Sequence, residues 1–215
     1  MRIIAGSKRG QVIDAPAGMN TRPTTDRVRE SLMSSIISRK GSFEALCVFD
    51  AFAGSGALAF ESLSRGAARA TLCDISREAL SCIKRNATRL GYDARSASVL
   101  RLDVLRDCAR LSTSSFDIAY FDPPYRLDAR VVVNLIQVLF SKGILEPDAL
   151  AVYEFSTVSE KDLCALLEHT PLRLDAYKAF GATRCAFLVY DTHADCDTHA
   201  ECDTHAECDT HAERN

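Results

Sequence analysis

Apolar residues along positions 1–190 fall into short blocks that alternate between a strand pattern and a helix pattern. Apolar runs bounded by turn residues predict strands at 45–51, 70–74, 96–103, 116–122, 150–155, 172–180 and 184–190. Between them, a 3.6-residue period predicts helices after Gly54 and ending near Gly66, after Asp103, and at 76–90, 130–140 and 161–169. Strands alternating with helices predict a doubly wound, mostly parallel α/β sheet of seven strands, to which the last two add an antiparallel edge.

Two of the helices and the first residues of the chain carry clear local signals. The helix at 76–90 has Ser76 as its capping residue, and its inward face is expected to hold Leu80, Ile83, Ala87 and Leu90. Another helix is predicted at 24–40, behind Pro23 and the capping candidates Thr24 and Thr25, with an apolar face of Val28, Leu32, Ile36 and Ile37. Residues 1–5 and 11–15 form short strand patterns around the turn-like 6–10, which predicts a hairpin with a basic tip.

Length and composition favour one cytoplasmic domain. The chain has 215 residues, and no stretch is apolar long enough to cross a bilayer or to act as a secretion signal. Its nine cysteines are therefore expected to be reduced. Six of them lie in apolar segments, where we interpret them as small buried residues: Cys47, Cys73, Cys82, Cys108, Cys164 and Cys185.

The net charge of −3 averages regions of opposite sign. Residues 191–215 carry eight acids and one base, whereas residues 1–190 carry 25 bases and 21 acids. Residues 1–40 alone hold eight bases and three acids, a net charge of +5. Basic charge at the front of the chain suits a partner that carries phosphates.

The last 25 residues repeat a hexad with almost no apolar side chain large enough to pack, so we expect 191–215 to be a disordered tail. Histidines and cysteines alternate in it at three-residue intervals that could close on zinc: His193, Cys196, His199, Cys202, His205, Cys208 and His211. Near-identical repeats lack the distinct supporting partners of a folded metal site. We therefore interpret the tail as a low-complexity segment and assign no metal site.

A glycine-containing turn follows the first core strand. Gly54 and Gly56 permit close approach of a ligand to the backbone, and the helix that follows offers free N–H groups. Asp74 ends the next strand twenty residues after Gly54, where a carboxylate can accept from both ribose hydroxyls. This spacing predicts an adenosine-type cofactor and fits both NAD and S-adenosylmethionine.

Two further carboxylates favour S-adenosylmethionine. Asp50 ends the strand just before the turn, where it would repel a pyrophosphate but attract the ammonium group of a methionine moiety. Asp103 ends the third strand and is placed to accept from an adenine amine. The remaining candidate contacts of this site are Phe52, Ile75 and Val104.

The fourth core strand runs into Asp122-Pro123-Pro124-Tyr125. Neither proline can donate to an inner sheet, so the strand must end at Asp122. The loop then holds an acid, carbonyl groups and an aromatic ring at the sheet edge where open α/β sheets bind ligands.

These motifs together resemble the RsmD family of bacterial methyltransferases. The resemblance rests on residues 21–31 (TRPTTDRVRES), the segment from Phe49 to Ala67, and FDPPY, and it covers about residues 1–190 but not the repeat tail. It implies a Rossmann-like class I methyltransferase domain over 41–190 and an RNA-binding extension over 1–40. It also implies methyl transfer from S-adenosylmethionine to the N2 amine of a guanine in 16S ribosomal RNA.

Within that family, Asp122 and the carbonyl of Pro123 would accept from the target amine, and Tyr125 would stack on the extruded base. Five basic residues are assigned to RNA, with the hairpin tip ordering over the active site: Lys8, Arg9, Arg22, Arg27 and Arg29. We expect a monomer that acts on ribosomal RNA or the small ribosomal subunit. The alternatives are a DNA adenine or cytosine amino-methyltransferase, a protein glutamine methyltransferase, an oxidoreductase and a non-catalytic RNA-binding protein.

Overall fold

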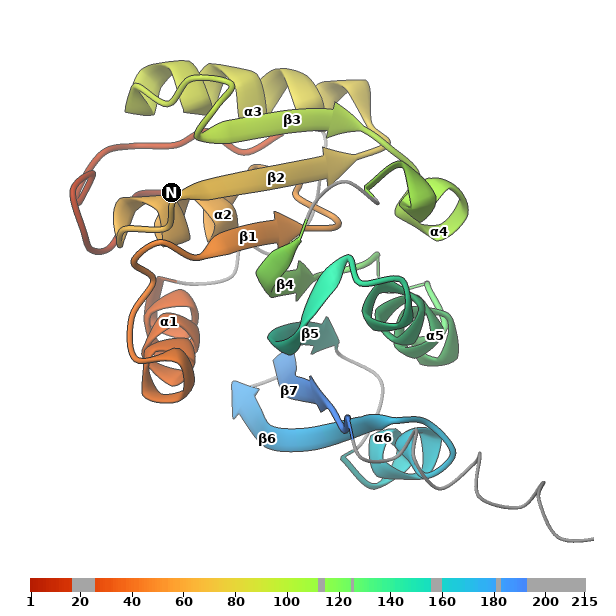
Figure 1. The fold of residues 1–215 in the computed structure, drawn as a ribbon. Coiled ribbons are helices and arrows are strands. Elements are labelled where there is room, and N and C mark those ends of the chain that lie inside the picture. Colours follow the sequence, from red (N-terminus) through yellow and green to blue (C-terminus); the bar gives the residue numbers. More distant parts are fainter. Residues whose placement is uncertain (17–25, 112–114, 125, 156–159, 181–182, 193–215) are drawn as a thin grey trace, which may run out of the picture.

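The computed structural model describes residues 1–16, 26–111, 115–124, 126–155, 160–180 and 183–192 (Figure 1). Their centre is a seven-stranded sheet in the order β3-β2-β1-β4-β5-β7-β6. The strands are β1 Cys47–Asp50, β2 Arg69–Asp74, β3 Ala97–Arg101, β4 Phe116–Phe121, β5 Leu145–Phe155, β6 Leu172–Phe180 and β7 Thr183–Tyr190. Strands β1 to β5 pair in parallel, whereas β7 runs antiparallel to both of its neighbours. The predicted sheet is confirmed.

One prediction missed half of a strand. Strand β5 begins at Leu145, five residues before the predicted start. Glu146, Pro147 and Asp148 interrupt the apolar run there, and the pairing of β4 with β5 shifts its register between Phe116 and Ile118.

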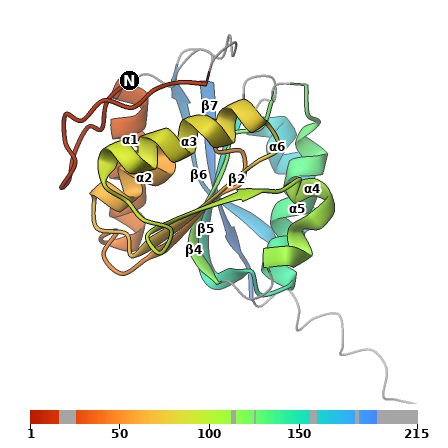
Figure 2. The same ribbon diagram turned by 90° about the horizontal axis from the view of Figure 1, so that it is seen from above.

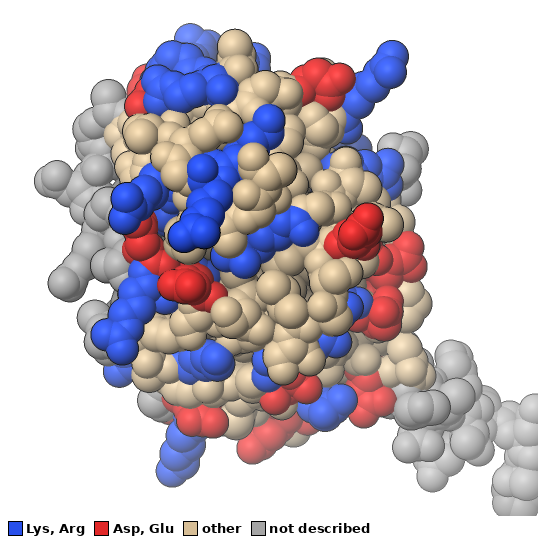
Figure 3. Space-filling view, turned by 90° about the vertical axis from the view of Figure 1, so that its left-hand side faces the viewer, with Lys and Arg blue, Asp and Glu red and all other residues tan. Residues whose placement is uncertain are grey.

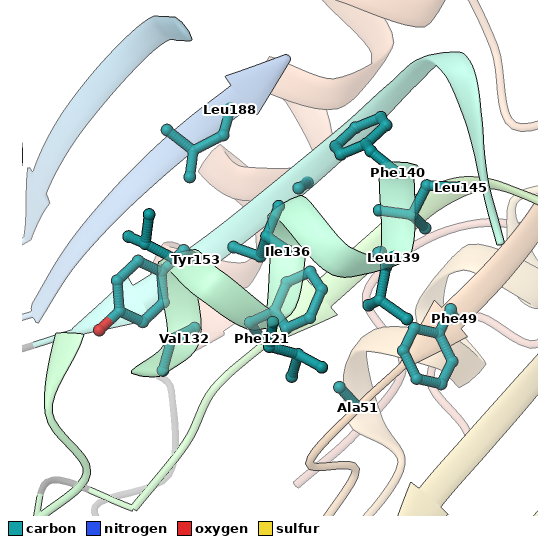
Figure 4. Packing of buried hydrophobic residues seen from close by; sticks show 14 of the residues in the cluster. Phe49, Ala51, Phe121, Val132, Ile136, Leu139, Phe140, Leu145, Tyr153 and Leu188 are labelled. Atoms are coloured by element: carbon teal, nitrogen blue, oxygen red, sulfur yellow. The ribbon is translucent and has the colours of Figure 1, made fainter. Parts of the chain in front are cut away.

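Helices cover both faces of the sheet (Figure 2). They are α1 Asp26–Lys40, α2 Ala57–Ser64, α3 Arg77–Leu90, α4 Val104–Asp107, α5 Ala129–Ser141 and α6 Glu160–Leu167, with a 3-10 turn at Cys108–Leu111. Helices α1, α2 and α3 share one apolar core with the sheet, and α4, α5 and α6 share the other. In the second core, residues such as Val132 and Ile136 of α5 pack over Phe121 and Tyr153 (Figure 4). No helix of the described chain combines the length and apolar character needed to cross a membrane.

Helix α3 follows its sequence signals closely. The Ser76 hydroxyl accepts from the N–H of Ala79 at 3.3 Å, and Gly91 ends the helix in the left-handed conformation with φ 75°. All four residues predicted to face inward are buried. Helix α1 differs, because Ile37 is exposed whereas Met33 lies in the core. Residues Pro23, Thr24 and Thr25 lie outside the described residues.

The predicted N-terminal hairpin is present as a turn rather than as two strands. A single antiparallel bridge joins Arg2 and Val12, while Ile3 and Ile13 are buried in the same core as α1. This packing ties the first residues of the chain to the sheet. The repeat tail from residue 193 lies outside the described residues, so its predicted disorder stays a prediction.

The cysteine prediction is partly right. Cys73, Cys82 and Cys185 are buried and Cys47 and Cys108 are half-buried, but Cys164 on α6 is exposed. All six are free thiols.

Candidate active site at the carboxyl edge of the sheet

The topology brings the predicted site loops together. From β1 the chain passes to β2 on one side, and after β3 it returns to β4 on the other side of β1. The loops after β1 and β4 therefore leave the sheet in opposite directions, and this is where doubly wound sheets bind ligands. The glycine turn follows β1 and the Asp122 loop follows β4.

Gly54 and Gly56 serve different purposes in the turn after β1. Both have left-handed backbones, with φ of 54° and 78°. A Cβ on Gly56 would lie 2.6 Å from Cε2 of Phe60 and 2.8 Å from Cδ2 of Leu72, so packing within the protein requires this glycine. A Cβ on Gly54 would meet only the carbonyl oxygen of Phe52, at 4.0 Å. The backbone at Gly54 is thus open to an approaching ligand.

Asp74 holds the glycine turn in place. Its Oδ2 accepts from the N–H of Gly54 at 2.9 Å, and its Oδ1 accepts from the N–H of Ser76 at 2.8 Å. Each carboxylate oxygen can accept a further bond, so the ribose contact predicted from the sequence stays a prediction. The next residue, Ile75, is 60% exposed and offers an apolar surface beside the turn.

Asp50 is a buried carboxyl group at the end of β1. Its side chain is 2% exposed, and burial together with the neighbouring charges of Asp122 and Asp74 raises its pKa to about 8. The backbone N–H groups of Ala59 and Phe52 favour the charged form but only partly offset this effect.

The Asp122 loop presents a carboxylate that has no hydrogen-bond donor among the described residues. Asp122 is exposed, yet the protein atoms around its carboxylate raise its pKa to about 6 by desolvation. Within residues 1–16, 26–111, 115–124 and the later described ranges, no group donates to this carboxylate or to the carbonyl of Pro123, whereas the carbonyl of Pro124 accepts from Leu127 at 2.8 Å. The loop therefore offers two acceptors side by side. Tyr125 lies outside the described residues.

Asp50, Asp74 and Asp122 form an acidic site that has no counter-ion among the residues the structure describes. No Lys or Arg of the described chain forms an ion pair with any of them. Among the same residues, no group of His, Cys, Asp and Glu side chains is arranged to hold a metal ion. A cationic organic ligand that relieves the repulsion among the three carboxylates fits this site. The site is consistent with an ammonium and sulfonium ligand.

The prediction from sequence missed Glu154 on β5. Phe121 pairs with Tyr153, so Glu154 of β5 and Asp122, just past the end of β4, each follow this pair, and the charges of both act on the thiol of Cys185. Glu154 pairs with Cys185 of β7, and Cys185 pairs with Lys178 of β6. Burial raises the pKa of the Cys185 thiol, and the nearby charges of Glu154 and Asp122 add to the effect. The available signal was an acid near the end of the apolar strand LAVYEF, since Asp50 ends β1 and Asp122 directly follows β4.

The other expected cofactor residues have structural partners of their own. Asp103 caps α4, accepting from the N–H of Leu105 at 3.2 Å, and its Oδ2 lies 3.5 Å from Arg106. Val104 is buried in the core, and Phe52 packs against the same core. Their contacts with a cofactor stay predictions.

The structure corrects part of the RNA-binding prediction. Arg29 is 1% exposed, pairs with Asp26 at 2.8 Å and donates to the carbonyl of Arg2 at 2.7 Å, so its guanidinium ties α1 to the N-terminus. Arg27 is exposed on α1. Arg22 lies outside the described residues.

The hairpin tip does not lie over the active site. The N–H groups of Ser7 and Lys8 donate to the carbonyl and hydroxyl oxygens of Ser64, at 2.7 and 2.9 Å. Ser64 is the last residue of α2, which begins beside the glycine turn and runs back along the sheet. The hairpin that carries Lys8 and Arg9 therefore lies at the amino edge, at the opposite end of the strands from the loop that follows β4 (Figure 1).

Comparisons with known proteins cover nearly the whole described chain. The family model described as conserved hypothetical protein 95 matches residues 1–189. A protein of Haemophilus influenzae named ribosomal RNA small subunit methyltransferase D is 33% identical over 165 residues, which cover 75% of this chain and 80% of that protein.

Solved structures agree with the fold. The structure of yhhF from Escherichia coli superposes with a TM-score of 0.71 at 30% identity, covering 89% of this chain and 98% of that chain. Magnesium protoporphyrin IX methyltransferase from Synechocystis, solved with bound S-adenosylmethionine, has a TM-score of 0.61 at 17% identity and covers 76% of this chain and 78% of its own. At that identity the second likeness concerns the fold alone. The predicted class I methyltransferase fold is confirmed.

Proposed function

Because this chain belongs to the RsmD family of ribosomal RNA methyltransferases, we propose that it methylates the N2 amine of a guanine in small-subunit ribosomal RNA. Membership makes the chain an S-adenosylmethionine-dependent rRNA methyltransferase, as predicted. The observation that carries the finer proposal is the pair of open acceptors at Asp122 and Pro123, next to an acidic site that pairs with no cation of the described residues.

The acidic site fits the charges of the cofactor. Asp50 would hold its ammonium group, the backbone at Gly54 would lie against it, and Ile75 would contact its adenosine part. When bound, S-adenosylmethionine supplies a methyl group on a sulfonium, an electrophile that needs no further activation by the protein. The task left to the protein is to present the amine in the right orientation.

The Asp122 loop would prepare the amine. An exocyclic guanine amine is a weak nucleophile because its lone pair is delocalised into the ring. The carboxylate of Asp122 and the carbonyl of Pro123 would accept its two N–H bonds and turn the lone pair out of the ring plane. The same acceptors stabilise positive charge that develops on the nitrogen.

Glu154 supports guanine as the target base. Guanine carries an N1–H donor beside its amine, whereas adenine and cytosine carry an acceptor at the corresponding position. A carboxylate next to Asp122 would accept from that N1–H and would repel an acceptor. Glu154 follows the Phe121–Tyr153 pair on β5, and its charge and that of Asp122 both act on the Cys185 thiol, so the two carboxylates are neighbours as this contact requires.

The proposal extends to partner and compartment. A ribosomal RNA substrate implies action in the cytoplasm, on RNA alone or on the small subunit. The name of the Haemophilus influenzae relative supports the small subunit. We propose that the chain acts as a monomer.

A labelling experiment tests the proposed reaction. The protein is incubated with methyl-labelled S-adenosylmethionine and, separately, with unmethylated small subunits, naked rRNA, DNA and protein release factors. We expect label in rRNA that digests to N2-methylguanosine. Label confined to DNA or protein contradicts the proposal, and label at another position of rRNA contradicts the assignment to N2.

The raised pKa of Asp50 predicts pH-dependent binding of the cofactor. Without ligand its pKa is about 8, so the group is mostly protonated at pH 7, and the ammonium favours its ionised form. Binding should therefore release a proton, and affinity should rise by up to about tenfold per unit between pH 5.5 and 7, where the ammonium stays charged. Calorimetry in buffers of different ionisation enthalpy measures the proton release. Asp50→Asn should bind more weakly and lose the dependence, and an unchanged affinity of the native protein over this range would contradict the assignment.

A further inference from the structure

Helix α3 carries a basic outer face that no step of the proposed reaction uses. Its exposed residues include Arg77, Lys84, Arg85 and Arg89, whereas Glu78 is its one acidic residue. Ser81, Lys84, Arg85, Thr88 and Arg89 line a shallow hollow on this face. The inner face of the same helix is apolar and packs on the sheet, so the basic residues all project outward.

The N-terminal hairpin extends this face. The ammonium of Lys8 lies 5.5 Å from the centre of the Tyr92 ring, just past the end of α3, and Arg9 beside it is exposed. Viewed from the amino edge, Lys and Arg outnumber Asp and Glu over the upper half of the molecule, where α3 and the hairpin lie (Figure 3). We call Lys8, Arg9, Arg77, Lys84, Arg85 and Arg89 the α3 basic surface.

Most of this charge is not neutralised within the described chain. Arg89 pairs with Asp14 at 2.8 Å, and Arg85 donates to the hydroxyl of Ser81 at 2.8 Å. Lys84 and Arg85 form no ion pair with any described residue. Neither has an acidic residue three or four positions away on the helix, and Arg85 and Arg89 form a like-charge pair that disfavours an isolated helix.

The surface connects with the active site. Helix α3 starts directly after Asp74 and Ser76 at the carboxyl edge and ends near Lys8 at the amino edge. From Arg77 to Arg89 it rises about 18 Å, long enough to follow several phosphates of one strand. A polyanion bound here would have one end beside the cofactor site.

We propose that the α3 basic surface binds the phosphate backbone of the substrate RNA outside the target nucleotide. The proposal rests on the proposed function, because it requires an RNA substrate. It assigns to α3 the RNA contact that the buried Arg29 cannot make. Its contacts are to phosphates, so they add affinity and orientation without reading sequence. Lys8 and Arg9 then contribute to RNA binding from the amino edge, not from above the active site.

The test compares two double variants with equal loss of charge. Lys84→Gln/Arg85→Gln removes the two unpaired cations of the hollow, and Arg130→Gln/Lys142→Gln removes two exposed cations at the ends of α5, on the other face of the sheet. Each is assayed for binding of labelled rRNA over a range of salt concentrations, for KM and kcat on small subunits, and for thermal unfolding.

We expect the α3 variant to raise KM about tenfold, with kcat within about twofold of the native value. The slope of log affinity against log salt should fall in magnitude by about 1.5, which corresponds to two lost phosphate contacts. The α5 variant should match the native protein. Equal behaviour of the two variants, or weaker binding to subunits at unchanged binding to naked rRNA, overturns the proposal.

The outcomes separate this proposal from the proposed function. If the native protein transfers no label to rRNA, but the α3 variant shows lower RNA affinity and a smaller salt slope, the binding surface is supported and the proposed reaction is contradicted. If rRNA methylation is normal and the two variants behave identically, the proposed reaction is supported and the proposed binding surface is contradicted.

Discussion

Asp122→Asn is expected to reduce kcat by about a hundred- to a thousandfold, while S-adenosylmethionine binds within about threefold of the native affinity. The substitution keeps the shape of the side chain but removes its charge and one acceptor. Asp122 receives no hydrogen bond from the described residues, so the folded structure should not depend on it. Single-turnover methylation measures the chemical step, and calorimetry measures cofactor binding.

The pH profile of the native enzyme gives a second readout. The pKa of Asp122 is raised to about 6, so the acceptor is lost as pH falls through that value. With S-adenosylmethionine saturating at every pH, the single-turnover rate of the native enzyme should therefore fall on the acid side near pH 6, and Asp122→Asn should lack this limb. Asp128→Asn is the matched control, since Asp128 is an exposed helix cap and asparagine also caps well. A variant at position 122 that retains more than about a tenth of the native rate contradicts the role of Asp122 as an acceptor.

Glu61→Ala is expected to lower the free energy of unfolding by about 3–5 kcal/mol, a large part of the stability of a typical domain. Glu61 is fully buried on α2 and ionically paired with Arg65 at 2.9 Å. Its Oε2 accepts from the N–H of Ile4 at 2.9 Å and its Oε1 from the N–H of Ala5 at 3.1 Å. Alanine would leave these two backbone donors and a largely buried arginine without their acceptor.

Urea denaturation of Glu61→Ala, Glu61→Gln and the exposed control Glu44→Ala measures this effect. Glutamine keeps one acceptor oxygen, so its loss should be smaller, about 1–3 kcal/mol. The control should stay within about 0.5 kcal/mol of the native protein. If Glu61→Ala unfolds at the same urea concentration as Glu44→Ala, the buried carboxylate does not anchor the N-terminal segment.

Local signals in the sequence predicted the elements best where they agreed with packing. Helix α3 combines a capping serine with a regular apolar face, and both appear as predicted. Prediction of α1 was weaker, because periodicity alone did not distinguish Ile37 from Met33, and the neighbouring sheet decides which side is buried. Strand β5 was shortened in the prediction because a polar stretch interrupts its apolar run, although the backbone continues to pair with β4.

The sequence by itself determined the α/β class, the family and the carboxylates that end β1 and β2 and follow β4, because apolar periods and loop motifs are properties of neighbouring residues. The tertiary structure alone decided which charges are buried, paired or brought close together. It buried Arg29 against Asp26, placed Lys8 at the amino edge, enclosed Glu61 under the hairpin and set Glu154 beside Asp122. These roles depend on residues far apart in the chain, and burial and electrostatic pairing arise only once the sheet has brought them together.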